Sequence, residues 1–196
     1  MIKRRTSSRA KIFDAALSLL DEYAFEAITV DKIIEVSGVA KQTYYNHFAT
    51  KQDVYVELSY KELFERTKSN VEDACAKYSM ADKRLERFFQ LCEISLKKDG
   101  HIERALMKEG LLASATPDKI APYMLAINDE LKHLITPAIE CGEMRNDTPL
   151  DFCIELIAGT LSNLVINWTN IPDYRLTRNR KLYTRVLVES LLKRKS

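Results

Sequence analysis

Turn-forming residues are scarce in this chain of 196 residues, which contains only five glycines and five prolines. The first 99 residues hold a single glycine, Gly38, and no proline. Because β-sandwiches and β-barrels need many tight turns, this scarcity argues against them. Apolar residues make up 46% of the chain and charged residues 30%, which excludes a disordered or collagen-like protein. We therefore expect an all-α protein of about nine helices.

Residues that carry catalysis or bind metals are also few. The four cysteines lie far apart without a CxxC pair, which is typical of reduced thiols in a cytoplasmic protein. Of the three histidines, only His133 has a glutamate three residues before it, whereas di-iron helical bundles need a second such copy. No GxSxG, P-loop or glycine-rich nucleotide motif occurs. The sequence thus predicts no metal, no cofactor and no enzymatic activity, with an all-helical metalloenzyme as a distant alternative.

A long apolar run is missing too, because the most apolar stretch, residues 156–166, is too short to span a bilayer. The formal net charge is only +2 at pH 7, but basic residues gather locally. No acidic residue lies between Glu35 and Asp53, and from Arg175 onward eight basic residues accompany a single acid. A further basic arm, residues 3–5, would either reach DNA or remain a disordered tail. Local basic stretches in a nearly neutral protein indicate a localised anionic partner.

The region around Gly38 has the pattern of a helix-turn-helix. Thr29 can cap a helix that stops at Gly38, and a short helix over residues 41–48 follows. Glycine readily adopts the left-handed conformation that costs other residues about 1–2 kcal/mol, which suits the turn. A helix-turn-helix places its second helix in the DNA major groove. The polar side chains of that helix that could reach bases or phosphates are Lys41, Gln42, Thr43, Tyr45, Asn46 and His47.

A longer run of residues extends this motif, namely Arg9-x-x-Ile12-x-x-Ala15-Ala16-x-x-Leu19, Phe25, Thr29-Val30-x-x-Ile33, Ser37-Gly38-Val39-Ala40, Thr43-x-Tyr45-x-His47-Phe48 and Lys51. Over residues 5–55 the run resembles the DNA-binding domain of the TetR family of bacterial regulators. Four positions depart from the family pattern: Ala24 replaces a glycine, Ile34 an alanine, Ala40 a serine cap and Tyr44 a leucine. These departures suggest a repacked junction between the two helices of the motif and leave the docking angle on DNA open.

The resemblance implies a dimeric transcription factor, usually a repressor that a small molecule releases from a near-palindromic operator. It implies a DNA-binding domain over residues 1–50 and an effector-binding and dimerisation domain over residues 51–196. Thr29 then corresponds to the helix cap that contacts a phosphate, and residues 41–43 correspond to the base contacts. Tyr45 and His47 correspond to contacts with the DNA backbone, and Lys51 to a phosphate-binding lysine. A regulator of the same fold that answers to a protein partner instead of a small molecule stays open.

The second half of the chain continues as helices, predicted near residues 51–78, 82–97, 101–115, 118–141, 149–170 and 177–193, with Pro122 and Pro137 expected to interrupt or kink the fourth of these. The last two expose more apolar surface than one chain of this size can cover, so we infer an isologous homodimer interface. A fully internal core helix is the alternative. The candidate interface residues are Phe152, Leu156, Gly159, Leu161, Ser162, Val165, Leu182, Val186, Leu187 and Leu191.

Aromatic, methionine and amide side chains of the middle helices could line a cavity for the effector. Each of them singly is ordinary core, since such residues at helical spacing usually just pack. Together they favour a mainly apolar pocket and hence a lipophilic or aromatic effector. The candidates are Tyr60, Phe64, Phe88, Phe89, Cys92, Met107, Leu111, Met124, Asn128, Asn163 and Trp168.

Overall fold

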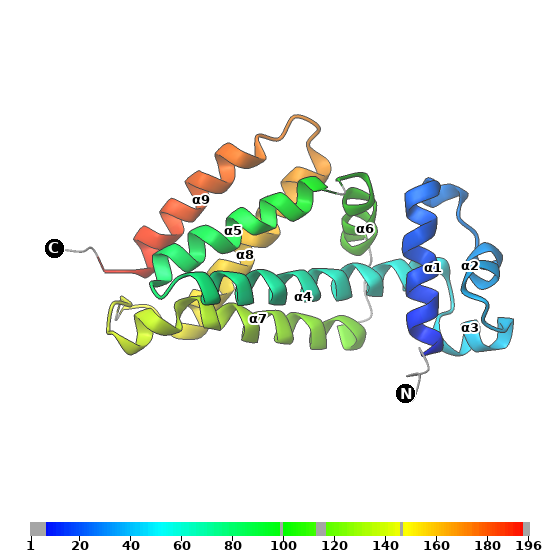
Figure 1. The fold of residues 1–196 in the computed structure, drawn as a ribbon, viewed down its shortest axis with the longest axis horizontal. Helices are drawn as coiled ribbons and strands as arrows, with labels where there is room; N and C mark the ends of the chain where they lie inside the picture. The colour runs from blue at the N-terminus through cyan, green and yellow to red at the C-terminus, as the bar shows by residue number, and fades with distance from the viewer. Residues whose placement is uncertain (1–6, 99, 113–116, 146, 194–196) are drawn as a thin grey trace. The chain divides into compact units, whose positions relative to one another are not determined.

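The computed structural model describes residues 7–98, 100–112, 117–145 and 147–193, apart from the side chains at positions 110–112, 117 and 119. Within these residues the chain forms nine α-helices, a 3-10 turn and no β-strand (Figure 1). The predicted all-α class is confirmed. The helices are α1 Ser8–Glu22, α2 Val30–Ser37, α3 Lys41–His47, α4 Lys51–Lys77, α5 Ala81–Lys98, α6 Gly100–Leu112, α7 Pro117–Glu140, α8 Leu150–Asn170 and α9 Leu176–Leu191, and the 3-10 turn η1 is Phe25–Ala27.

The helices pack into two compact units, which we call the N unit and the C unit. The N unit comprises Met1–Tyr60 and Gly100–Ala115, and the C unit comprises Lys61–Asp99 and Thr116–Ser196. Helix α4 therefore begins in the N unit and ends in the C unit, and α6 belongs with the N-terminal helices. The predicted boundary at residue 50 separates a DNA-binding domain from an effector-binding domain by function, whereas these two units are defined by packing. The functional boundary therefore stays a prediction.

In the N unit, α1 packs against α2, α3 and α6. Its apolar stripe is buried, as the three- and four-residue spacing predicts, with Ile12 and Ala16 fully inaccessible. The helix begins at a cap, because Ser7 Oγ accepts a hydrogen bond from the Ala10 amide at 3.2 Å. The buried Tyr55 hydroxyl of α4 donates to the Ala16 carbonyl at 2.9 Å. This bond ties the start of α4 to the middle of α1.

In the C unit, α5 packs against α7 and α9, α7 against α8, and α8 against α9. An ionic group joins α5 to α9: the buried Glu93 carboxylate accepts hydrogen bonds from Lys97 Nζ at 2.6 Å, from Arg180 Nε at 2.6 Å and from the Thr177 hydroxyl. Burial acts to raise the pKa of Glu93, but these three donors outweigh it and lower the pKa to about 2. We call Glu93, Lys97, Thr177 and Arg180 the Glu93 cluster.

Of the two outcomes expected at the prolines of α7, an interruption or a kink, the interruption is wrong, because a single helix runs from Pro117 to Glu140 through both of them. Pro137 has no N–H, so the carbonyl of His133, four residues earlier, loses its helical donor. Arg84 of α5 supplies a replacement, with Nη1 2.9 Å from the His133 oxygen, and the Cys75 thiol lies 3.6 Å from the same oxygen. Donors from α4 and α5 thus satisfy the carbonyl that the proline leaves open.

Arg84 should therefore stabilise the C unit by joining three of its helices. Its Nε also donates to the Tyr78 carbonyl, just beyond the end of α4, at 2.7 Å. We expect Arg84→Ala to lower the free energy of unfolding by about 2 kcal/mol, because carbonyls are left without a charged donor. Chemical denaturation measures this. Replacing the neighbouring Lys83, an exposed side chain whose ion pair with the exposed Glu86 is screened by solvent, should change stability little.

A double-mutant cycle gives the sharper form of this prediction. In a Pro137→Ala background residue 137 regains an N–H that can reach the His133 carbonyl, so Arg84→Ala should cost less there than in the natural chain. Equal costs in the two backgrounds would contradict the role that we assign to the Arg84 bond.

Helix α8 is longer than the apolar run that the sequence suggested. With 21 residues it is long and apolar enough to cross a membrane by length and composition alone, which corrects the expectation drawn from residues 156–166. Its inner face is nevertheless buried in the C unit, for example at Ile157 and Trp168. A core helix of a soluble protein passes the same test, so the feature is weak evidence for a membrane.

Candidate DNA-binding surface

The turn between α2 and α3 has the local geometry that the sequence predicts. Thr29 precedes α2 in an extended conformation, and its Oγ1 accepts the Lys32 amide at 3.2 Å. Helix α2 ends at Gly38, whose φ of 63° lies in the left-handed region and whose amide bonds back to the Ile34 carbonyl at 3.0 Å. Helix α3 then starts at Lys41 without a side-chain cap, because Ala40 offers no acceptor.

Helix α3 divides into a buried side and an exposed side. Tyr44 is fully buried, and Phe48, directly after the helix, is 1% exposed, with its ring centroid 5.6 Å from that of Phe13 of α1. The Tyr44 hydroxyl donates to the Thr50 carbonyl at 3.2 Å, and burial raises the pKa of Tyr44 to about 12. This contact accommodates the tyrosine that stands where the TetR-family pattern, which the sequence resembles, has a leucine. The sequence-predicted DNA contacts Lys41, Gln42, Tyr45 and Asn46 are exposed, and Thr43 and His47 are half-buried.

Two side-chain pairs order the exposed side of α3. Lys41 Nζ lies 3.0 Å from Asp31 Oδ1 of α2, and this hydrogen bond, together with the carboxylate charge, raises the pKa of Lys41. Gln42 Nε2 donates to Asn46 Oδ1 at 3.1 Å, one turn further along the helix. Residues 36–52 contain no acidic side chain, but in the folded protein the Asp31 carboxylate of α2 lies beside Lys41 in this stretch. Spacing along the sequence gave no sign of it.

Lys51 has a structural role that sequence reasoning missed. Its half-buried ammonium donates to the Phe25 carbonyl at 2.7 Å and to the Ile28 carbonyl at 2.8 Å, and it lies 4.2 Å from the centroid of the Phe25 ring. These bonds fix η1 and the segment before α2 to the start of α4. One N–H of the ammonium is left for a DNA phosphate, so the predicted phosphate contact stays a prediction alongside the structural role.

Arg9 is a second residue of this region whose role the sequence did not reveal. Its Nε donates to Glu57 Oε1 of α4 at 3.0 Å, and its guanidinium lies 5.0 Å from the centroid of the Phe48 ring. Glu57 is only 6% exposed, so α4 holds a buried carboxylate against α1. The pair connects α1, the end of α3 and α4, which are the elements that set the position of α3. The basic arm at residues 3–5 lies outside the described residues.

The residues proposed to line an effector cavity are spread over both units. In the C unit, Phe88 and Phe89 are fully buried, with ring centroids 5.2 Å apart, and Trp168 is 6% exposed. Phe64, Cys92, Met124 and Asn128 are half-buried there, while Asn163 is exposed on α8. Tyr60 and Met107 belong to the N unit, where they are half-buried and buried, and the Leu111 side chain lies outside the described residues.

Asn128 stands out among these candidates because its Oδ1 is buried without a hydrogen-bond partner among the described residues. Cys92 is different: it accepts from Asn70 Nδ2 at 3.5 Å, and burial raises its pKa to about 12. Among the described residues, no three histidine, cysteine, aspartate or glutamate side chains gather as metal ligands do.

The predicted dimer residues also divide into two sets. Leu161, Val165, Leu187 and Leu191 are buried inside the C unit, so their side chains pack within their own chain and do not form a free face. The exposed set consists of Phe152, Gly159 and Ser162 on α8 and Leu182 and Val186 on α9, with Leu156 half-buried. Ile166, which sequence reasoning left out, is 41% exposed on α8.

Known proteins resemble this chain in sequence and fold. The family model described as bacterial regulatory proteins, tetR family, matches residues 12–58. The fatty acid metabolism regulator protein of Bacillus subtilis (strain 168) is 24% identical over 198 residues, covering 97% of this chain and 98% of that protein.

Solved structures that share the fold include two FadR proteins. The transcriptional regulator FadR from Bacillus subtilis, in complex with stearoyl-CoA, has a TM-score of 0.70 at 23% identity and covers 92% of this chain and 97% of that one. FadR from Thermus thermophilus, a TetR-family repressor in complex with lauroyl-CoA, has a TM-score of 0.74 at 21% identity, with coverages of 96% and 97%.

Proposed function

The chain belongs to the TetR family of bacterial regulatory proteins, and from this premise we propose that it is a dimeric repressor that an acyl-chain effector releases from its operator. As a member of this family it is a DNA-binding transcriptional regulator. The observation that carries the proposal is the left-handed Gly38 turn, which presents the exposed Lys41, Gln42, Tyr45 and Asn46 of α3 on one surface. A helix presented in this way enters the major groove.

Base readout is assigned to the start of α3, and phosphate contacts to Thr29, Tyr45, His47 and Lys51. Amide side chains such as Gln42 suit adenine edges, and lysine suits guanine edges. Operator half-sites should lie about one or more helical turns of ~34 Å apart, as the symmetry of a dimer requires. Selection of bound fragments from genomic DNA tests the assignment, since absence of selective retention would contradict it.

Replacing Gln42 with alanine should change the ranking of operator variants by about 1–3 kcal/mol per lost bidentate base contact. Competition binding with single-base operator variants at fixed salt measures this ranking. Tyr45→Phe serves as the control: it removes a hydroxyl that is assigned to a phosphate, so it should weaken binding to all sequences about equally without changing their order. If the order stays the same in Gln42→Ala, that side chain does not read bases.

The dimer is proposed to form through the exposed apolar side chains of α8 and α9. Phe152 is 53% exposed, Val186 54% and Leu182 39%, and an exposed apolar face of this kind marks a contact surface. The exposed Gly159 would allow close approach of a partner helix. Sedimentation of the free protein tests this, because a single subunit in solution would contradict the model of two half-sites.

The effector is proposed to be a long-chain acyl-CoA bound in the C unit. Two lines of support exist: the FadR structures of the same fold contain stearoyl-CoA and lauroyl-CoA, and the C unit has apolar candidates such as Phe88 and Trp168. The buried, unpartnered Oδ1 of Asn128 would gain a donor from a ligand or from a bound water. Helix α4 passes from one unit to the other, so a ligand beside its C-terminal half could move its start.

Linkage makes the effector proposal testable. Acyl-CoA should bind the free protein more tightly than the operator complex, and operator affinity should fall by the same factor when acyl-CoA is present, typically by about 1–3 kcal/mol. Calorimetric titration with acyl-CoA of several chain lengths, with free CoA as the control, measures both. Equal affinity with and without operator would contradict the allosteric role while leaving the DNA-binding function intact.

A further inference from the structure

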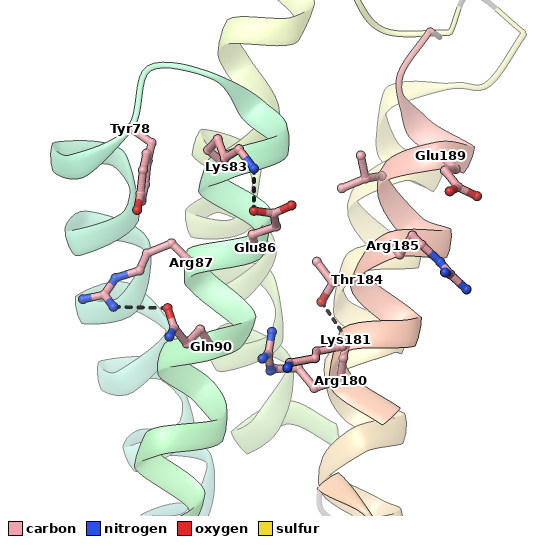
Figure 2. A pocket seen from close by; sticks show the side chains of 11 residues that line it. Tyr78, Lys83, Glu86, Arg87, Gln90, Arg180, Lys181, Thr184, Arg185 and Glu189 are labelled. Atoms are coloured by element: carbon pink, nitrogen blue, oxygen red, sulfur yellow. Dashed lines mark hydrogen bonds and ion pairs between the residues drawn. The ribbon is translucent and has the colours of Figure 1, made fainter. Parts of the chain in front are cut away.

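A hollow of about 480 Å³ lies between α5 and α9 in the C unit (Figure 2). Residues 83–90 of α5 form one wall and residues 180–189 of α9 form the other, with Tyr78 at one end. Cavities of this size hold small molecules in other proteins. Its lining includes five cationic side chains and two carboxylates, and Glu93 and Asp73 outside the lining pair with Arg180 and Arg87, so an anionic ligand would meet a small excess of positive charge.

Arg180 offers the strongest anion donors in this hollow. Its side chain is only 12% exposed, and its Nε is held by Glu93 Oε2 at 2.6 Å. Among the described residues, no hydrogen bond uses its two terminal nitrogens. A guanidinium fixed at Nε presents its remaining N–H groups in the fork that matches a phosphate or carboxylate.

Lys181 stands beside it, and in Figure 2 both side chains extend from α9 toward α5. Lys181 has no ion-pair partner within the described part of the chain. Arg87 and Gln90 extend from α5 away from α9 in Figure 2, where Arg87 Nε bonds to Asp73 at 2.7 Å and its Nη1 donates to the Gln90 oxygen at 3.4 Å. The cationic groups that face the hollow at this end are therefore Arg180 and Lys181.

The charge in the hollow is concentrated at this end. At the opposite end Lys83 is neutralised by Glu86 at 2.8 Å, and Glu189 adds a second carboxylate on α9, across the hollow from Tyr78. The hollow thus joins a cationic end of Arg180 and Lys181 to an end where the Lys83 charge is paired and an aromatic ring, Tyr78, is present.

We propose that the hollow between α5 and α9 is a binding site for a small phosphorylated molecule of about nucleotide size. The phosphoryl oxygens accept hydrogen bonds from the terminal nitrogens of Arg180 and from Lys181 Nζ. The volume exceeds that of a bare phosphate, so the organic part of the ligand extends toward Tyr78. This goes beyond the acyl effector, which the apolar residues of the core would hold. Lys181 and Val186 lie on different sides of α9 at 3.6 residues per turn, so the cationic end of the hollow faces away from Val186 of the proposed dimer face.

Calorimetric titration of the full chain with ADP and with inorganic pyrophosphate, at physiological salt, tests the proposal. We expect saturable binding at one site per chain. Lys181→Glu should weaken binding at least tenfold, because it places a carboxylate against the phosphates. The matched control is Arg178→Glu, which makes the same charge change at an exposed position of α9 outside the hollow and should weaken binding less than twofold.

Arg180→Lys provides the second variant, because lysine keeps a positive charge for Glu93 but loses the forked donors. Weaker ADP binding at an unchanged unfolding temperature would support the assignment of Arg180. Absence of heat with both ligands at millimolar concentration would overturn the proposal, as would equal losses in Lys181→Glu and Arg178→Glu. Binding of citrate in place of ADP and pyrophosphate would overturn it in favour of a carboxylate site. None of these results depends on operator binding.

Discussion

Replacing Glu93 with glutamine is expected to lower the free energy of unfolding by about 3 kcal/mol at pH 7, as when one partner of a buried ion pair is removed. The amide cannot accept the same set of charged donors, and it leaves the Arg180 guanidinium, 12% exposed, without a counter-charge. The contact of α5 with α9 depends on this carboxylate, because Lys97, Thr177 and Arg180 all bond to it. Denaturant unfolding monitored by circular dichroism gives the value.

The pH dependence gives an independent measure of the same cluster. The pKa of Glu93 lies at about 2 in the folded protein, below its ordinary value of 4.5. A carboxyl group whose pKa is lowered by folding stabilises the fold fully above its ordinary pKa, and that stability is lost as the pH falls toward 2. The natural chain should therefore lose stability between pH 4.5 and pH 2 more steeply than Glu93→Gln.

Asp147 supplies the matched control for this test. Hydrogen bonding from Arg145 lowers its pKa to about 2 as well, but the pair is exposed. Solvent screens an exposed pair, so Asp147→Asn should leave stability at pH 7 unchanged. A loss in Asp147→Asn as large as that in Glu93→Gln would contradict the claim that burial makes the Glu93 cluster important.

Replacing Lys51 with methionine is expected to destabilise the N unit by about 3 kcal/mol and to weaken every operator sequence together. Methionine keeps the apolar stem but leaves the Phe25 and Ile28 carbonyls without their charged donor. The segment that leads into α2 would then lose its attachment to α4. Thermal unfolding, hydrogen exchange of amides in residues 7–60 and operator binding measure the effects.

Lys41→Met is the control, because it removes the same charge from an exposed position of α3. It should weaken operator binding without changing the exchange rates of the N unit. A lysine that only binds phosphate would behave in the same way at position 51, lowering the salt dependence of binding by about one charge and leaving stability intact. That outcome would refute the structural role of Lys51.

Local patterns in the sequence predicted most of the elements correctly. The spacing of Ile12, Ala16 and Leu19 fixes the buried face of α1, and the Thr29 cap and Gly38 turn bound α2 as expected. The prolines gave a wrong prediction of an interruption at Pro137, because the donor that replaces its missing N–H comes from Arg84 of α5. Arg84 lies 49 residues before His133, whose carbonyl it bonds. A sequence pattern indicates that a proline removes a helical hydrogen bond, but it does not indicate that a distant side chain supplies another donor.

The candidate site was predicted less completely than the helices. The exposed side of α3 follows from its residue types, but the Asp31 carboxylate beside Lys41 and the carbonyls that hold Lys51 do not. Each depends on packing between elements that are separated along the chain. Part of the predicted dimer set, such as Leu161, is buried within its own chain and does not form a free face. The reason is related: the sequence shows that a side chain is apolar, but not whether its own chain or another chain covers it.

By itself the sequence determined the helical class, the turn at Gly38 and the polar side chains of the helix that follows, because these depend on interactions within a few residues. Only the tertiary structure decided which cationic side chains form hydrogen bonds within the protein and which remain available to a ligand. Lys51 bonds to carbonyls 23 and 26 residues earlier, and Arg180 bonds to a carboxylate 87 residues earlier. Charge is set by residue type, whereas its availability to a ligand is set by the neighbours that folding supplies.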